Sequence, residues 1–93
     1  IEELRAMALR ATLADRFDGR AYMLVGVAEM WLRHHDLAHA FLTEALRLNP
    51  SLAKAYSQLG SNYSLSGNPA ASLEPLRTAL RLSPLDNEVF HML

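Results

Sequence analysis

The sequence predicts an all-α protein built from a repeated pair of helices, and three observations lead to this fold class. The chain of 93 residues restates itself at an offset of 34 residues. No segment shows the strict alternation of apolar and polar residues that marks a half-buried strand. Glycine and proline residues stand at the positions where the helices of such a repeat would end.

The internal repeat is clearest where residues 79–84 (Ala-Leu-Arg-Leu-Ser-Pro) restate residues 45–50 (Ala-Leu-Arg-Leu-Asn-Pro). Aligning residues 19–52 with residues 53–86 gives nine identities in 34 positions without a gap. These identities fall largely on aromatic, small and proline residues, which are the types that helix packing and helix ends require. The duplication therefore predicts two copies of one structural unit.

The period and its content resemble the tetratricopeptide repeat (TPR). In residues 53–86 the resemblance lies in Tyr56, Leu59-Gly60, Tyr63, Gly67, Leu76, Ala79-Leu80 and Pro84, with Ser72 where the family prefers alanine. In residues 19–52 it lies in Tyr22, Val25-Gly26, Ala38, Leu42, Ala45-Leu46 and Pro50. Here Glu29 replaces the second aromatic residue and Arg33 replaces the turn glycine.

The resemblance implies antiparallel helix-turn-helix repeats stacked as a short right-handed α-solenoid. We expect a preceding helix in residues 1–18, as a half-repeat or a cap, and full repeats at 19–52 and 53–86. Residues 87–93 would be the first helix of a further, truncated repeat. Because the chain begins with Ile1 rather than Met, we expect it to be an excised piece of a longer protein.

The helices are expected over residues 2–14, 19–33, 36–48, 53–66, 70–82 and 87–93. Asp18, Ser51 and Asp86 are candidate N-caps, Asn68 with Pro69 begins the fifth helix, and Gly67 ends the fourth in a left-handed conformation. Gly26 and Gly60 would let a neighbouring helix approach closely. Pro75 lies inside the fifth predicted helix, where we expect a local kink.

In a TPR fold the first helix of each repeat lines the inner, concave face, which commonly holds a peptide or a partner helix. Helical spacing predicts that the groove is lined by Arg20, Met23, Val27, Met30, Trp31, Lys54, Ser57, Ser61, Asn62, Ser64, Glu88 and His91. This face would be apolar at one end and rich in hydroxyl groups at the other. An alternative is that Met23, Met30 and Trp31 pack against the first helix.

Some TPR domains grip a terminal carboxylate with lysine and asparagine on their first helices. The matching positions here hold Met23, Val27 and Ser61, so we do not expect such a clamp. Two other polar features stand out. His34, His35, Asp36 and His39 form a candidate metal constellation, but polar residues are also ordinary at a turn between helices. Glu29 could contact a partner, or form a surface ion pair with Arg33, four residues on.

Composition narrows the function. The net charge of −1 argues against nucleic-acid binding by this domain, and the absence of cysteine excludes disulfides and thiolate metal sites. No apolar run reaches the length of a membrane span, no signal-peptide layout opens the chain, and no glycine-rich phosphate loop or Gly-x-Ser-x-Gly elbow is present. We expect a cytoplasmic, non-catalytic chain without cofactors or metals.

The sequence therefore predicts a protein–protein interaction module that acts as a scaffold or adaptor and binds a peptide or partner helix. One alternative is a regulatory TPR segment of a bacterial signalling protein with a winged-helix or nucleotide-cyclase domain, because residues 79–86 are similar to repeats found there. Another is a TPR chaperone for secreted subunits. The apolar end at residues 89–93 would meet further repeats, or a second copy to form a homo-oligomer.

Overall fold

The computed structural model describes residues 2–14 and 17–84 and is helical over most of them. The α-helices are α1 (Glu2–Ala14), α2 (Gly19–Trp31), α3 (His35–Leu48), α4 (Ala53–Leu65) and α5 (Leu73–Leu82), and a 3-10 helix, η1 (Pro69–Ser72), precedes α5. No strand occurs in these two ranges. The five expected helices that fall there are confirmed, while the sixth lies outside the described residues.

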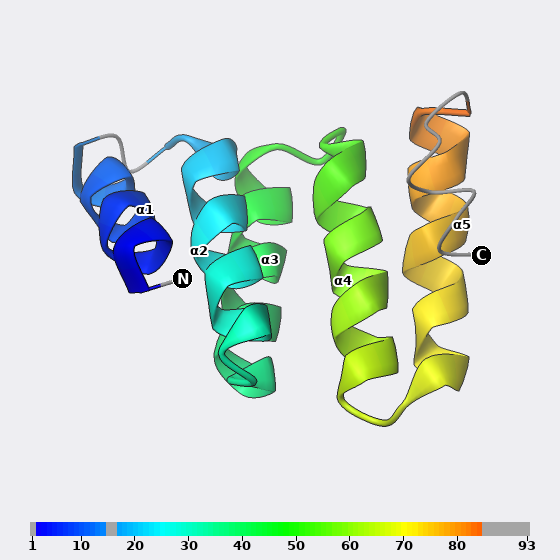
Figure 1. Cartoon of the computed structure of the whole chain (residues 1–93). Coiled ribbons are helices and arrows are strands. Elements are labelled where there is room, and N and C mark those ends of the chain that lie inside the picture. The colour runs from blue at the N-terminus through cyan, green and yellow to red at the C-terminus, as the bar shows by residue number, and fades with distance from the viewer. Residues whose placement is uncertain (1, 15–16, 85–93) are drawn as a thin grey trace.

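Helices α1, α2, α4 and α5 follow one another across the molecule, and α3 lies behind α2 in the view of Figure 1. Helix α2 packs against α3 and α4 packs against α5, so each predicted repeat forms a helical hairpin. Helix α1 packs on α2. Helix α3 of the first hairpin packs against α4 of the second hairpin. Helices α2 and α4 also contact each other directly, which places the first helices of the two hairpins on one side of the molecule.

Two glycines allow the helices of each hairpin to approach closely. A Cβ atom on Gly26 would lie 2.8 Å from the Leu42 Cγ atom, and a Cβ atom on Gly60 would lie 2.7 Å from the Leu76 Cγ atom. Both distances are too short for a real side chain, so the leucine of the second helix fills the space that the glycine leaves. The same contact thus recurs one period later, as the sequence predicts.

The core around these contacts is built mainly from small and aliphatic side chains. The buried apolar residues are Ala21, Val25, Ala28, Met30, Ala38, Leu42, Ala45, Ala55, Leu59, Leu76 and Ala79. The interior of such a close-packed stack leaves little space for larger residues. The positions shared by both repeats are therefore mainly positions of contact between helices.

The turn after each first helix places one residue in the left-handed region. Gly67 has a φ of 91°, as expected, and Arg33 adopts a φ of 65° at the matching position of the first hairpin. A residue with a Cβ atom pays a conformational cost there that glycine does not pay. The first turn therefore keeps the shape of the second despite the substitution.

The helix starts differ in part from expectation. The Asp18 carboxylate caps α2 by accepting the Arg20 amide at 3.0 Å, which confirms that cap. Asn68 precedes η1 with Pro69 at its first position, but its side chain makes no capping bond. The assignment of Ser51 was wrong, because Leu52 takes the N-cap position of α4 and the Ser51 hydroxyl donates to Asn49.

Pro75 does not kink the interior of an α-helix. The chain runs as 3-10 helix up to Ser72 and becomes α-helical at Leu73, so Pro75 is buried in the first turn of α5. Backbone amides of the first helical turn have no acceptor within the helix, and the amide that proline lacks is therefore not missed. The change of helix type removes the conflict that the sequence suggested.

Candidate functional site

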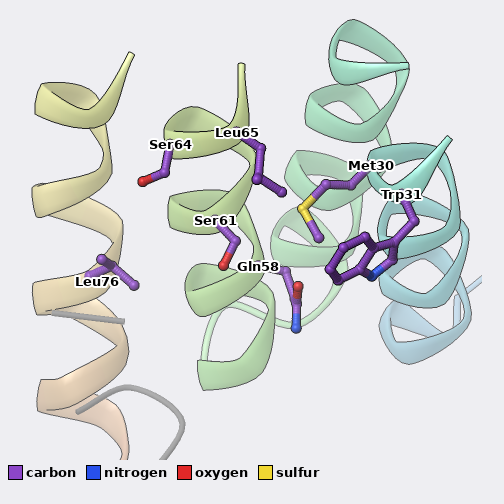
Figure 2. A pocket seen from close by; sticks show the side chains of 7 residues that line it. All are labelled: Met30, Trp31, Gln58, Ser61, Ser64, Leu65 and Leu76. Carbon is purple, nitrogen blue, oxygen red and sulfur yellow. The ribbon is translucent and has the colours of Figure 1, made fainter. Parts of the chain in front are cut away.

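A hollow lies where α2 and α4 face each other, near the ends of both helices. Its volume is about 390 Å³, and it is lined by Met30, Trp31, Gln58, Ser61, Ser64, Leu65 and Leu76. Figure 2 shows Met30 and Trp31 reaching from α2 toward the side chains of α4. We call this space the Trp31 hollow. Its size is within the usual range for a ligand site.

The apolar part of the Trp31 hollow combines a buried base with an exposed rim. Met30 and Leu76 are buried, at 2% and 3% exposure. Trp31 and Leu65 are 61% and 55% exposed, although both are large apolar residues. They occupy equivalent positions of α2 and α4, one repeat period apart. The stack of hairpins therefore presents two apolar side chains in register to solvent.

Helix α4 adds polar groups to the same hollow. Gln58, Ser61 and Ser64 line it, and Figure 2 shows their side chains along the face of α4 between α2 and α5. An amide group and two hydroxyl groups can each donate and accept hydrogen bonds. The hollow thus offers apolar contact together with groups suited to the backbone of a bound segment.

A second, adjoining hollow shares three residues with the first. It is lined by Met30, Trp31, Arg33, His35 and Leu65, with a volume of about 430 Å³. The indole of Trp31 therefore stands between two spaces. Arg33, which adopts the left-handed conformation in the turn after α2, adds a cationic side chain to the lining of the second hollow.

A third hollow lies at the opposite ends of α2 and α4. It has a volume of about 520 Å³ and is lined by Arg20, Met23, Asn49, Ser51, Leu52, Ala53, Lys54 and Ser83. Arg20 and Lys54 are also equivalent residues one period apart, and both are exposed. We call this space the basic hollow.

The predicted groove residues thus divide among several surroundings. Met30, Trp31, Ser61 and Ser64 line the Trp31 hollow, whereas Arg20, Met23 and Lys54 line the basic hollow. Val27 is half-buried on α2 and lines neither hollow. Glu88 and His91 lie outside the described residues.

Two of the predicted groove residues are buried instead. Ser57 is 1% exposed, and its hydroxyl donates to the Ala53 carbonyl at 3.4 Å. Asn62 is 3% exposed and joins α4 to the start of α3. Its Oδ1 atom lies 2.8 Å from His35 Nδ1, and its Nδ2 atom donates to the His35 carbonyl at 3.0 Å. Both residues hold the backbone, so neither is open to a partner.

Glu29 is buried between helices, which contradicts both expectations drawn for it from the sequence. Its side chain is 1% exposed, and its carboxylate accepts a hydrogen bond from Arg5 Nε of α1 and lies 2.8 Å from His34 Nδ1. Burial raises the pKa of the Glu29 carboxyl, but the hydrogen bonds from Arg5 and His34 outweigh that effect and hold the pKa below its usual value. Glu29 therefore ties α1 to the first hairpin, and neither pairs with Arg33 nor faces a partner.

The three histidines of the candidate metal constellation each have a different neighbour. His34 contacts Glu29, His35 contacts Asn62, and the His39 ring lies 5.7 Å from the ring of Tyr63 at an angle of 61°. Within residues 2–14 and 17–84, no three His, Asp or Glu side chains gather closely enough to hold a metal ion. The rings are used for packing and hydrogen bonding between helices.

Sequence reasoning missed Gln58, Leu65 and Leu76 as lining residues of the Trp31 hollow and Arg33 as a lining residue of the adjoining one. Leu65 carried a usable signal, because it lies one period after Trp31 and an apolar residue at both positions is a repeated feature. Gln58 carried none, since one polar residue on a helix does not show which neighbour it will face. Arg33 stands out in the sequence only because it replaces the turn glycine, which does not show which space its side chain lines.

Comparison with known proteins identifies the fold. No family model matches the chain, and no curated protein matches its sequence. The solved structure of YrrB, described as a TPR protein with an unusual peptide-binding site, superposes with a TM-score of 0.83 at 23% identity. The structure of MamA superposes with a TM-score of 0.82 at 22% identity.

The chain has a TPR-like fold. The match to YrrB covers 90% of this chain and 43% of YrrB, and the match to MamA covers 95% of this chain and 52% of MamA. The chain therefore spans about half the length of either solved protein. The expected architecture, antiparallel helix-turn-helix units stacked as a short right-handed α-solenoid, is confirmed. None of the helices that the structure describes has the length and apolar content needed to cross a bilayer.

Proposed function

We propose that this TPR-like chain is a non-catalytic protein-interaction module that binds a peptide segment or helix of a partner. The observation that carries the proposal is the pair of exposed apolar residues, Trp31 and Leu65, one period apart on the rim of one hollow. A partner side chain placed between them would rest on Met30. We further propose that repeats at residues 19–52 and 53–86 form this site together.

Covering this rim makes a substantial contribution to the free energy of binding. A tryptophan side chain buries roughly 150–250 Å² when fully covered, at about 25 cal/mol per Å². Trp31 is 61% exposed, and covering this exposed part of its surface contributes about 2–4 kcal/mol. Side chains of this kind dominate the binding energy of many interfaces. The adjacent side-chain amide of Gln58 and the hydroxyl group of Ser64 supply partners for backbone groups of the bound segment.

The comparison with YrrB supports the same proposal in a general way. That protein, whose fold is similar, is described as having a peptide-binding site. A scaffold or adaptor role is therefore the function that the geometry supports best.

The proposal is tested with the tryptophan itself. Trp31 is the only tryptophan of the chain, so its fluorescence reports occupancy of the hollow directly. Peptides selected from a phage-displayed library of random 12-residue sequences should shift the Trp31 emission to the blue as they bind. Trp31→Ala removes this fluorescence signal, so its affinity is measured by isothermal titration calorimetry; it should be at least about tenfold weaker, because the residue has the size and exposure of a hot spot.

Leu37→Ala is the matched control. Leu37 is also a large, exposed apolar residue, at 48% exposure, but it lies on α3 and lines none of these hollows. Its substitution should leave peptide affinity unchanged. Equal loss of binding in the two variants, or peptides that bind without a change in Trp31 fluorescence, would argue against the hollow as the site.

A further inference from the structure

The charged residues that line the hollows of α2 and α4 share one sign. The described lining residues with a permanent charge are Arg20 and Lys54 in the basic hollow and Arg33 beside the Trp31 hollow. No described carboxylate lines any of these three spaces. The chain as a whole has a net charge of −1, so its composition does not explain this excess.

The carboxylates of the described helices lie elsewhere or are already paired. Helix α4 contains none, and the single carboxylate of α2, that of Glu29, is buried against Arg5 and His34. Asp18, just before α2, caps the helix by accepting the Arg20 amide. Within the part of the chain that the structure describes, no carboxylate lies within ion-pair distance of Arg20 or Lys54. This surface therefore attracts negative charge that the described chain does not supply.

We infer that the bound segment is an extended acidic peptide, with a carboxylate between Arg20 and Lys54 and a large apolar side chain in the Trp31 hollow. The inference rests on the proposed function and specifies the chemistry of its ligand. The carboxylate would be held by two cationic side chains one repeat period apart. Because these bind any carboxylate, an aspartate or glutamate within the peptide fits as well as the C-terminal carboxylate of the peptide. This arrangement differs from a clamp for a terminal carboxylate, whose lysine and asparagine are absent.

The distance between the two hollows sets the spacing within the peptide. Arg20 and Trp31 are separated by three turns of α2, and Lys54 and Leu65 by three turns of α4, which is about 16 Å along each helix axis. An extended chain advances about 3.3 Å per residue, so the carboxylate and the apolar residue should be about five positions apart. The flexible side chains of arginine and lysine widen this to roughly four to six positions.

The electrostatic part of binding should be modest and sensitive to salt. Exposed ion pairs contribute little individually and are screened beyond about 10 Å at 0.1 M salt. The apolar contact at Trp31 does not share this dependence. The peptide affinity should therefore fall several-fold between 20 mM and 500 mM sodium chloride while some binding remains.

The test selects peptides from the random 12-residue library on the 93-residue chain and compares two double variants. Arg20→Glu/Lys54→Glu reverses the basic hollow. Arg77→Glu/Arg81→Glu makes the same change in net charge on exposed residues of α5 that line a separate hollow. Circular dichroism of both variants checks that the helices are retained.

The inference predicts three results. Selected peptides carry aspartate or glutamate four to six positions from a large apolar residue. The Arg20→Glu/Lys54→Glu variant binds them about tenfold more weakly and, in a fresh selection, enriches lysine and arginine at the acidic position. The Arg77→Glu/Arg81→Glu variant binds within twofold of the parent chain.

Other results separate this inference from the function on which it rests. Peptides that need Trp31 but show no acidic preference and no salt dependence would overturn the inference and leave the proposed function intact. Failure to select any peptide that alters Trp31 fluorescence would overturn both. Binding of a 12-residue oligothymidylate that is lost in Arg20→Glu/Lys54→Glu would assign the basic pair to phosphate groups and would also overturn the inference.

Discussion

The contact between Gly26 and Leu42 predicts a substitution whose effect on stability changes sign with its surroundings. A Cβ atom on Gly26 would lie 2.8 Å from Leu42 Cγ and 3.0 Å from Leu42 Cδ2, and Leu42 is fully buried. Forcing an extra methyl group into such a contact costs about 1–3 kcal/mol. Replacing a glycine within a helix by alanine gains about 1 kcal/mol from helix propensity. The net effect of Gly26→Ala should be a loss of about 1 kcal/mol.

Shortening Leu42 should reverse that sign. Leu42→Ala removes the buried Cγ and Cδ atoms and should cost about 2–5 kcal/mol through lost contacts and a cavity. In this background the new methyl group at position 26 enters the vacated space, while its 3.3 Å contact with the Ala38 carbonyl oxygen remains, so Gly26→Ala should stabilise the chain by up to about 1 kcal/mol. The coupling between the two sites is then up to about 2 kcal/mol, within the usual range for residues in contact.

The assay is thermal and urea unfolding of the four variants, followed by circular dichroism. For a chain of this size 1 kcal/mol corresponds to a change of about 4–8 °C in Tm. The pair Gly60 and Leu76 makes the same contact at 2.7 Å and should show the same pattern, which supplies an internal replicate. If Gly26→Ala raises the Tm of the parent chain as much as that of Leu42→Ala, the close contact on which this reasoning depends is wrong.

Three further predictions concern the turns and the buried polar groups. Arg33→Gly should raise stability by about 1 kcal/mol and Gly67→Ala should lower it by a similar amount in urea unfolding, because both positions have positive φ. A loss of stability in Arg33→Gly, or a gain in Gly67→Ala, would contradict the turn geometry. Since the folded pKa of Glu29 lies below its unfolded value, its ionised form adds stability at neutral pH that is lost as the pH falls below about 4.3 and the carboxylate becomes protonated. The deficit of Glu29→Gln should therefore be largest near pH 7 and shrink steadily in acid; a constant deficit would refute the pairing. Asn62→Ala should cost about 1–3 kcal/mol by leaving groups of the half-buried His35 without their partner on α4, and an unchanged unfolding midpoint would show that the link between α3 and α4 does not form.

The sequence allowed most of the helical architecture to be predicted, because the repeat itself reports contacts between helices. Gly26 and Gly60 recur with Leu42 and Leu76 one period apart, and each pair meets in the structure. These contacts could be predicted from the 34-residue period alone, without knowing which residues far apart in the sequence meet. Helix ends were less well defined, since Leu52 rather than Ser51 caps α4.

The buried polar groups could not be predicted in the same way. Glu29 suggested a local pair with Arg33 four residues on, but its cationic partner, Arg5, is 24 residues away on another helix. Asn62 is next to Ser61 in sequence, yet one step of 100° on the helix turns its side chain from the solvent side toward the start of α3. Helical spacing assigns a face only to within about one residue, so it could not separate the groove from the contact beside it.

The location of the binding site is tested most directly by nuclear magnetic resonance of the ¹⁵N-labelled chain titrated with a selected peptide. The account predicts that the indole N–H signal of Trp31 and the amide signals of Ser61, Ser64 and Leu65 shift most and saturate together. Shifts confined to α1, or to residues of α3 that line none of the hollows, would contradict it.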